Sequence, residues 1–338
     1  MASIQRDHDL AHANTLGLPC VAERFTAPAT LAALEEALAE ARSRGWPLTL
    51  LGGGSNLILP ERLPGLVVQP AMADWWREPA GEGRVRVHAE AGVNWHELVM
   101  ALAARGLWGT ENLALIPGSC GAAPIQNIGA YGVELADVLE AVEVLHLATG
   151  CREVMTPAAC AFGYRDSIFK GALDGRVVVT RLVLALSTAP RPRLGYGDLA
   201  ARVGTTPGAL EVAEAVCAIR REKLPDPARL GNAGSFFKNP LVAARHAERL
   251  LAEFPEMPHF PQPDGRVKLA AGWLIDQCGL KGRREGHFGV HERQALVLVH
   301  FGGGSAGELL AFAERVAGRV EERFGVSLER EPRLAGIG

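Results

Sequence analysis

Two glycine-rich segments are the first parts of this sequence whose residue types suit ligand binding. The first, Gly52-Gly53-Gly54-Ser55-Asn56, lies between apolar runs at residues 48–51 and 57–59, which predicts a strand, a glycine loop and a second strand. Glycine accepts positive φ angles, so successive N–H groups can converge on a phosphate. The segment lacks the spacing of a nucleotide-hydrolase loop or a Rossmann fingerprint. Taken alone, a tight turn between strands explains such a short motif in roughly two cases of three.

The second segment, residues 116–132, is more informative because it has neither a helical nor a strand period. An aperiodic loop of this length inside a compact domain is usually functional or disordered. Ile116, Ile125, Ile128 and Tyr131 require burial, which argues against disorder. The small side chains between them predict a backbone wrapped tightly round a large ligand. Two such loops suit a dinucleotide with a pyrophosphate, and a glycine-rich structural crossover is the weaker alternative.

Three other features carry no predicted function. Residues 302–305 (Gly-Gly-Gly-Ser) separate a strand from a long helix, and Ser305 is a natural N-cap, so a loop and a helix start explain them. His287 and His291 are four residues apart, but Gly289 between them weakens any helix, so we expect no metal pair. His291 is expected to support a site residue or to be structural. The six cysteines have no C-x-x-C pair and no metal-ligand spacing, which predicts reduced thiols.

Length and composition set the class of protein. The 338 residues suit two or three domains, and 48% apolar residues are ample for buried cores. The longest apolar stretch is interrupted by Arg181, and no signal peptide opens the chain, so we expect a cytoplasmic protein. A net charge of −3 with dispersed Lys and Arg argues against nucleic-acid or membrane partners.

Hydrophobic periodicity predicts the elements that must position the two loops. Helices are predicted at residues 31–44, 95–105, 211–223, 241–254, 269–278 and 306–324, with a short helix opened by Thr156-Pro157. Strands are predicted at residues 21–25, 84–90, 138–148, 177–187 and 295–301, besides the two that flank the first loop. Pro225-Asp226-Pro227 indicates a domain boundary, and residues 327–334 are expected to pair back with the first domain. The overall pattern is α+β with three lobes.

Eight blocks of this sequence together resemble the family of UDP-N-acetylenolpyruvoylglucosamine reductases, over about residues 14–336. Any one block alone is a weak pattern, and their combination is highly specific. The blocks are residues 51–56 (LGGGSN), 111–118 (ENLALIPG), 124–132 (PIQNIGAYG), 162–170 (FGYRDSIFK), 223–227 (KLPDP), 232–240 (NAGSFFKNP), 271–278 (AGWLIDQC) and 290–298 with its Gln-Ala-Leu-Val-Leu core.

The resemblance implies a fold of the vanillyl-alcohol-oxidase type, in which two lobes grip FAD non-covalently and a C-terminal α+β domain covers a sugar nucleotide. On this basis we expect residues 1–72, completed by 326–338, to form the first FAD-binding lobe. Residues 73–224 would form the second lobe and residues 225–325 the substrate-binding domain. The implied FAD-binding residues are Gly52, Gly53, Gly54, Ser55, Asn56, Pro117, Gly118, Ser119, Gly121, Ala122, Asn127, Ile128, Gly129 and Ala130.

The family reaction is reduction of an enolpyruvyl ether to a lactyl ether, with NADPH as co-substrate. By residue matching, Ser235 is the proton donor, and Arg165 and Glu331 are the other catalytic residues. A neutral Glu331 would stabilise an enolate best, which burial arranges by raising its pKa. Pro332 follows this glutamate, whereas proline precedes it in the family pattern, so Glu329 remains an alternative. Without the blocks, Ser235 could cap a turn, and the charged residues could be surface ion pairs.

The same matching assigns substrate-binding residues and leaves two rival functions open. The implied residues are Tyr164, Tyr196, Lys223, Asn239 and Gln294, with Tyr196 in a loop at 194–199 that resembles the one which closes over substrate in one subclass. Lys223 could instead merely offset the helix dipole. The rivals are an oxidase on the same fold, and a non-catalytic flavin- or nucleotide-sugar-binding protein. We expect a monomer whose partners are NADPH and the UDP-linked enolpyruvyl sugar.

Overall fold

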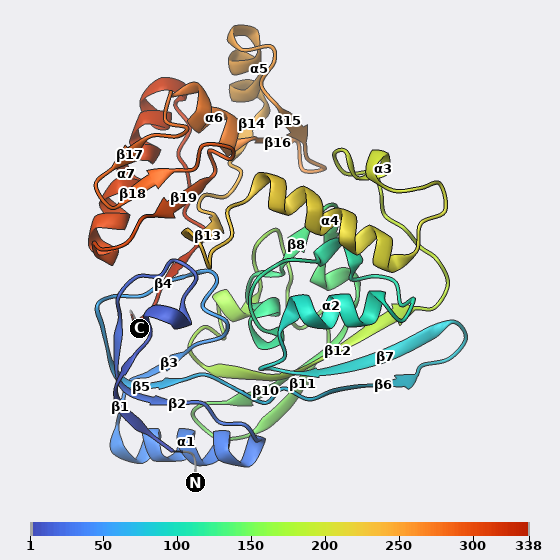
Figure 1. Cartoon of the computed structure of the whole chain (residues 1–338), viewed down its shortest axis with the longest axis vertical. Helices are drawn as coiled ribbons and strands as arrows, with labels where there is room; N and C mark the ends of the chain where they lie inside the picture. The colour runs from blue at the N-terminus through green and yellow to red at the C-terminus, as the bar shows by residue number, and fades with distance from the viewer. Residues whose placement is uncertain (1–2, 337–338) are drawn as a thin grey trace.

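The first sheet of the computed structural model, which describes residues 3–336, consists of four strands. Their order is β1-β2-β5-β3, with β1 (Gln5–Asp9) antiparallel to β2 (Val21–Thr26), while β5 (Arg62–Val68) runs parallel to β2 and β3 (Leu48–Leu50). Helix α1 (Leu31–Arg44) lies below this sheet in Figure 1. Thr30 accepts a hydrogen bond from the Ala33 N–H at its start, and Gly45 ends it at φ 64°. The predicted helix at 31–44 is confirmed.

A second sheet of five antiparallel strands forms the middle of the molecule. The order is β11-β10-β12-β7-β6, made of β6 (Trp75–Pro79), β7 (Arg84–Glu90), β10 (Leu139–His146), β11 (Arg152–Met155) and β12 (Val177–Ser187). Helices α2 (Trp95–Ala103) and α4 (Ala209–Lys223) cover one face of it (Figure 1). Asn94 accepts a hydrogen bond from the Glu97 N–H at 3.1 Å, which confirms the predicted cap. The largest apolar core lies between these helices and the sheet.

The C-terminal part holds a third sheet and three helices. Its strand order is β13-β19-β18-β17, and β14, β16 and β15 form a smaller sheet beside it. The strands are β13 (Gly231–Ser235), β14 (Leu241–Ala243), β15 (His259–Pro261), β16 (Arg266–Leu269), β17 (Arg284–Glu285), β18 (Phe288–Val290) and β19 (Val297–His300), and the helices are α5 (Ala244–Glu253), α6 (Ala271–Gln277) and α7 (Ala306–Phe324). Ser305 and Glu308 form a capping box at α7, as expected for residues 302–305.

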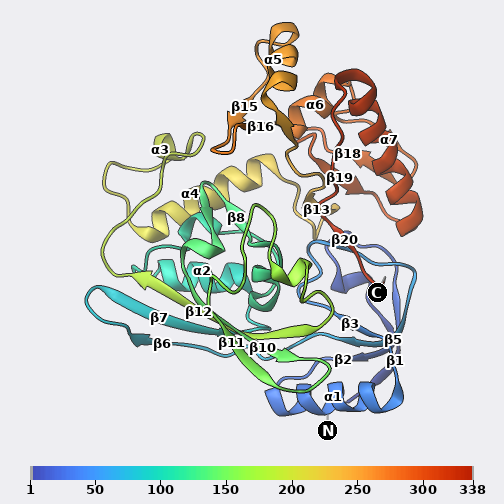
Figure 2. The same cartoon turned by 180° about the vertical axis from the view of Figure 1, so that it is seen from behind.

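The end of the chain returns to the first sheet region, as predicted. Strand β20 (Arg333–Leu334) pairs in parallel with β4 (Leu57–Ile58), so Arg333 lies opposite Leu57 directly after the first glycine loop. Figure 2 shows this terminal strand descending from the third lobe to the first. The C-terminal segment therefore contacts two lobes that are far apart in the sequence.

Two predictions about local structure are wrong. The segment at 241–254 is not one helix, because its first three residues pair with β16 as strand β14. Thr156-Pro157 opens only a single turn, closed by Cys160 N–H to the Thr156 carbonyl, and Ala161 then leaves the helical region at φ 47°. The polar N-terminus contains β1, which pairing with β2 stabilises despite its polarity.

Within residues 3–336, no helix is both long enough and apolar enough to span a membrane.

Short connecting elements complete the chain. They are the 3-10 helices η1 (Ala11–Ala13), η2 (Glu111–Leu113), η3 (Cys120–Gln126), η4 (Leu135–Asp137) and η5 (Ile168–Lys170), the helix α3 (Leu199–Arg202), and the strands β8 (Gly129–Ala130) and β9 (Val133–Glu134). The predicted aperiodic loop at 116–132 thus contains η3, which contacts β12 and β7, and β8, which pairs with β9 directly after the loop. The predicted α+β class is confirmed.

Candidate active site

Both predicted glycine loops line one cavity of about 690 Å³. This volume lies within the roughly 300–1,000 Å³ that is typical of ligand sites. Of the fourteen residues predicted to bind FAD, twelve line the cavity, and Asn127 and Ala130 do not. The twelve are Gly52, Gly53, Gly54, Ser55, Asn56, Pro117, Gly118, Ser119, Gly121, Ala122, Ile128 and Gly129.

The two loops pack backbone against backbone, so these positions require glycine. A Cβ on Gly53 would lie 2.6 Å from the Cα of Gly118, which no folded chain accommodates without movement. The Ser55 hydroxyl donates to the Pro117 carbonyl at 3.0 Å and ties the loops together. The loops therefore form one continuous wall of the cavity, and neither loop forms this wall alone.

Asn127 is buried, and its side-chain hydrogen bonds stabilise the conformation of the second loop. Its side-chain amide donates to Glu134 Oε2 at 2.7 Å and to the Gly163 carbonyl at 3.2 Å, and its oxygen accepts from the Ala136 N–H at 3.0 Å. The residue has a positive φ of 45°, which asparagine tolerates better than most residues. Asn127 thus holds the second loop against the segment that carries Arg165.

Ser235, Arg165 and Glu331 all line the same cavity, although they come from distant parts of the chain. Arg165 Nε lies 3.3 Å from Glu331 Oε1, and Arg165 Nη2 donates to the Gly129 carbonyl at 2.7 Å. The cation is therefore held between the second glycine loop and the C-terminal segment.

Backbone pairing brings Glu331 to Ser235. The Glu331 N–H donates to the carbonyl of Phe236, the residue after Ser235, at 2.9 Å, and the Lys238 N–H donates to the Glu329 carbonyl at 2.9 Å. The C-terminal segment thus runs antiparallel to the residues that follow β13 before it reaches β4. This long-range pairing has no local pattern in the sequence.

The two candidate carboxylates lie in different environments. The side chain of Glu331 is 12% exposed, whereas that of Glu329 is 73% exposed and forms an ion pair with Lys238. Burial raises the pKa of Glu331 above its ordinary value, although Arg165, Lys170 and Lys238 oppose this shift. Glu331 can therefore stay neutral at a higher pH than an exposed glutamate, and it is the carboxylate that faces the cavity.

The backbone of Arg165 is in the left-handed region, with a φ of 54°. A non-glycine residue is strained there, and surrounding contacts must hold it. The Lys170 ammonium donates to the Arg165 carbonyl at 3.0 Å, and Gly163 and Asp166 pair through two backbone hydrogen bonds across the turn. Burial lowers the pKa of Lys170. Lys170 was not predicted as a site residue, because the only sequence signal for it is that it ends the 162–170 block.

Arg220 of α4 also lines the cavity and was not predicted. Its Nε is buried without a hydrogen-bond partner, and within residues 3–336 its side chain forms no ion pair with a carboxylate. Burial lowers the pKa of this guanidinium. A buried cation without a counter-ion is costly unless a bound anion pairs with it. The helical period predicted α4 but not which of its polar residues would face the cavity.

The five predicted substrate residues do not line this cavity, and the contacts of their side chains divide them into three groups. The Lys268 ammonium lies 4.9 Å from the centroid of the Tyr164 ring, and the guanidinium of Arg165 also lies over this ring. Tyr196 is 56% exposed and meets Tyr131 edge-on at 5.7 Å, while Lys223 lies 3.6 Å from Asp198 of the same loop. Asn239 and Gln294 both lie at the start of α6, since Asn239 accepts from the Ala271 N–H and Gln294 Oε1 lies close to Gly272.

Comparison with known proteins gives one consistent result. Residues 226–335 match the family model described as UDP-N-acetylenolpyruvoylglucosamine reductase, C-terminal domain, and residues 22–154 match an FAD binding domain. Reductases of that name from Chromobacterium violaceum and Pseudomonas aeruginosa are each 49% identical to this chain, over 96% of this chain and 97% of the first, and over 98% of this chain and 98% of the second.

A crystal structure of UDP-N-acetylenolpyruvylglucosamine reductase from Thermus caldophilus is similar over nearly the whole chain. It has a TM-score of 0.66 at 27% identity, covering 99% of this chain and 98% of that one. Together with the FAD binding domain match, this confirms the predicted flavoprotein fold with its C-terminal α+β part.

Proposed function

This chain belongs to the family of UDP-N-acetylenolpyruvoylglucosamine reductases and is an FAD-dependent oxidoreductase, and on that premise we propose how it works. It uses NADPH to reduce the enolpyruvyl ether of UDP-N-acetylglucosamine to UDP-N-acetylmuramate, a precursor of peptidoglycan. The observation that carries this proposal is the convergence of Ser235, Arg165 and Glu331 on the cavity that the two glycine loops line.

The residues of the cavity suit a bound dinucleotide. The wall made by residues 52–56 and 117–122 offers mainly backbone, and Arg220 offers a guanidinium with a buried Nε and no ion pair within residues 3–336. FAD bound there would supply the redox chemistry, which is hydride transfer from NADPH to the substrate double bond through the flavin N5. The protein itself must position the substrate, stabilise negative charge and donate a proton.

We assign charge stabilisation to Arg165 and Glu331. Addition of a hydride to the double bond leaves an enolate conjugated with the substrate carboxylate, and the guanidinium of Arg165 can hold such an anion through its planar fork. Arg165 and Gln126 both direct a donor at Glu331 Oε1, at 3.3 and 3.4 Å. The proton of a neutral Glu331 therefore belongs on Oε2, from which it can donate a hydrogen bond to the enolate.

We assign the proton transfer to Ser235. A serine hydroxyl is a weak acid, but an enolate-like carbanion is a strong enough base to take its proton when the hydroxyl is held in place. Ser235 ends β13, where it pairs with Val297, so the sheet fixes its backbone at the cavity. This rigid placement supports the role of proton donor over that of a turn cap.

The substrate residues would hold the nucleotide part outside the cavity. Tyr196 is on an exposed loop that an ion pair between Lys223 and Asp198 links to α4, which suits a side chain that closes over a ligand. Asn239 and Gln294, at the start of α6, present amide groups suited to phosphate or sugar oxygens. We propose these four residues, with Tyr164, as the surface that binds the UDP-linked sugar.

The three-lobe division at 1–72 with 326–338, 73–224 and 225–325 remains our proposal for the domain boundaries, and residues 1–2 and 337–338 of it lie outside the described part of the chain. Each proposed lobe holds a sheet of its own, and β20 adds the C-terminal segment to β4. Limited proteolysis tests this division: cleavage should concentrate near residue 225, and protected fragments that cross that boundary would contradict it.

Anaerobic stopped-flow absorbance of the flavin band tests the function. NADPH should bleach the bound flavin, and the UDP-linked enolpyruvyl sugar should restore its colour without oxygen. Ser235→Ala should leave the bleaching step unchanged and slow the second step by about 10²–10⁴-fold. Recovery of colour by oxygen alone would favour the oxidase alternative, and unchanged rates in Ser235→Ala would remove the serine from the mechanism.

A further inference from the structure

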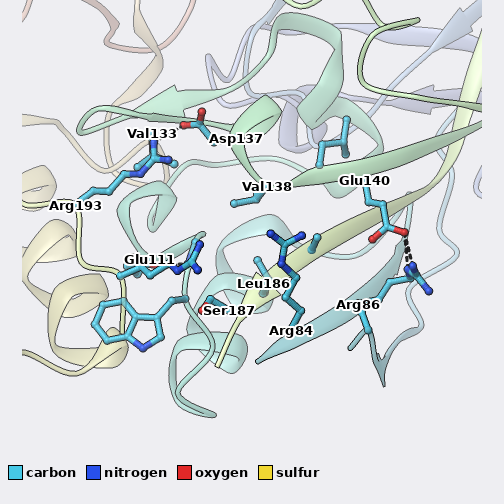
Figure 3. A pocket seen from close by; sticks show the side chains of 16 residues that line it. Arg84, Arg86, Glu111, Val133, Asp137, Val138, Glu140, Leu186, Ser187 and Arg193 are labelled. Atoms are coloured by element: carbon cyan, nitrogen blue, oxygen red, sulfur yellow. Dashed lines mark hydrogen bonds and ion pairs between the residues drawn. The ribbon is translucent and has the colours of Figure 1, made fainter. Parts of the chain in front are cut away.

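A second cavity of about 530 Å³ lies in the middle lobe, away from the candidate active site. It is bounded by the start of β7, the end of β12, the segment 137–140 and residues 191–193 (Figure 3). Its lining residues and those of the first cavity have no member in common. A ligand held here would therefore not occupy the flavin cavity.

Four arginines line this cavity, and two of them have no ion-pair partner among the described residues. Arg86 pairs with Glu140 at 2.6 Å, and Arg193 pairs with Asp137 at 2.8 Å. Arg84 and Arg191 form no ion pair with any carboxylate in residues 3–336. Figure 3 shows the Arg84 guanidinium turned from β7 towards Val138, over the cavity. The cavity thus holds two positive charges that no carboxylate of residues 3–336 neutralises through an ion pair.

The floor of the cavity is apolar and contains one buried acid. Trp108, Val138 and Leu186 are all less than 8% exposed and line it. Glu111 is 2% exposed, and its Oε2 accepts a hydrogen bond from the Gly109 N–H at 2.6 Å. Burial raises the pKa of Glu111, which favours its neutral form, so this residue offsets the two arginines less than an exposed carboxylate would.

We propose that this cavity is a second binding site, and that its ligand is a small phosphate monoester with an apolar body. A phosphate monoester carries about 1.5 to 2 negative charges at neutral pH, which matches the two unpaired arginines. Guanidinium forks bind phosphate oxygens in pairs, and the surface around Trp108 and Leu186 accepts the apolar body.

Binding at this site reaches the active-site loops through hydrogen bonds. The buried Asn112 amide donates to the Arg193 carbonyl at 2.8 Å and to the Tyr131 carbonyl at 2.9 Å. Tyr131 contacts Tyr196, and Arg191 lies in the segment that directly precedes Tyr196 in the chain. A ligand that links Arg84 on the sheet to Arg191 fixes the base of the Tyr196 loop. The site therefore acts on the substrate loop without touching substrate.

The test uses the FAD-loaded full chain with phenyl phosphate and inorganic phosphate as probes. Calorimetry should show binding of phenyl phosphate that weakens by about tenfold or more in Arg84→Gln/Arg191→Gln. Arg245→Gln changes an exposed arginine on α5 that has no ion pair within residues 3–336, so it is the matched control and should bind as the wild type does. Both altered arginines are exposed, so the double variant should keep the wild-type melting temperature.

Hydrogen exchange locates the bound probe. Phenyl phosphate should slow exchange in peptides that cover residues 84–86 and 187–199, and this protection should vanish in the double variant. Equal protection in the double variant, or protection confined to the glycine loops, would place the probe elsewhere and overturn the proposal. Equal affinity for phenyl phosphate and inorganic phosphate would contradict the apolar part of the ligand.

Discussion

Gln126 and Glu331, from the second glycine loop and the C-terminal segment, meet with the Gln126 amide nitrogen 3.4 Å from Glu331 Oε1. Gln126 Oε1 in turn accepts from the Asn56 amide at 2.5 Å, so the first loop joins the same network. All three residues line the cavity. The Gln126 amide therefore links both glycine loops to Glu331, the proposed acid. A change at Gln126 should impair the function of Glu331 rather than the binding of the cofactor.

Gln126→Ala should slow reoxidation of the flavin by the enolpyruvyl sugar about five- to tenfold, the effect of losing about 1 kcal/mol from one hydrogen bond. The rate of reduction by NADPH should change little, because the acid has no part in that step. Single-turnover stopped-flow kinetics measures both steps separately. Equal loss in the two steps would mean that Gln126 serves the cofactor.

Glu331→Gln should slow the reoxidation step by about 10²-fold or more, because an amide cannot supply the proposed acidic hydrogen bond. Glu329→Gln is the matched variant and should keep nearly full activity, since its side chain is exposed and paired with Lys238. The same half-reaction measured in both variants decides between the two carboxylates. Loss only in Glu329→Gln would reverse our assignment.

Stability should depend on pH through Glu331. The pKa of Glu331 is raised in the folded state. Its contribution to the free energy of unfolding is therefore fully present below the ordinary carboxyl pKa and is lost as the pH rises through the raised pKa. Glu331→Gln removes this dependence. Urea unfolding across that pH range should therefore show the wild type losing stability relative to Glu331→Gln as the pH increases, and parallel curves would argue against a buried, raised carboxyl.

Lys170→Met should shift the alkaline limb of the reoxidation rate to higher pH. The Lys170 charge lowers the pKa of Glu331, so its removal lets the neutral acid persist further. The rate below that limb should also fall, because the strained Arg165 loses the donor to its carbonyl. Lys170→Arg keeps the charge and should restore the pH profile, and an unshifted limb in Lys170→Met would leave Lys170 with a structural role alone.

Gly53→Ala should weaken FAD binding and lower the melting temperature, since the added methyl group would lie 2.6 Å from the backbone of Gly118. Gly318→Ala, in the interior of α7, is the control, because its added Cβ would meet no atom of residues 3–336 within 4 Å apart from its chain neighbours and its own helix backbone. It should stabilise the protein by about 0.5–1 kcal/mol through helix propensity. FAD titration and thermal unfolding of both variants measure these effects, and unchanged FAD affinity in Gly53→Ala would show that the loops can separate freely.

Arg220→Met should raise the stability of the FAD-free protein and weaken FAD binding. The change removes a buried cation that has no partner in the described residues, and with it the charge that we expect to meet an anion. Chemical unfolding without FAD and fluorescence titration with FAD measure the two effects. Loss of stability without FAD would indicate that Arg220 serves the fold rather than the ligand.

The sequence by itself determined the elements whose signals are local. Capping residues and the 3.6-residue period predicted α1 and α7 at the bounds observed, because a helix depends on contacts within a few residues. The two glycine loops could likewise be recognised from composition. The motif blocks then predicted the family, which the comparisons confirm.

Only the tertiary structure decided which groups face one another. Strand β14 forms because it pairs with β16 instead of continuing into α5, and the polar β1 forms because it pairs with β2. The choice of Glu331 over Glu329 likewise depends on the pairing of the C-terminal segment beside Phe236, which buries one side chain and exposes the other. Burial, charge pairing and the resulting pKa shifts arise from contacts across long stretches of chain, and a linear sequence does not contain them.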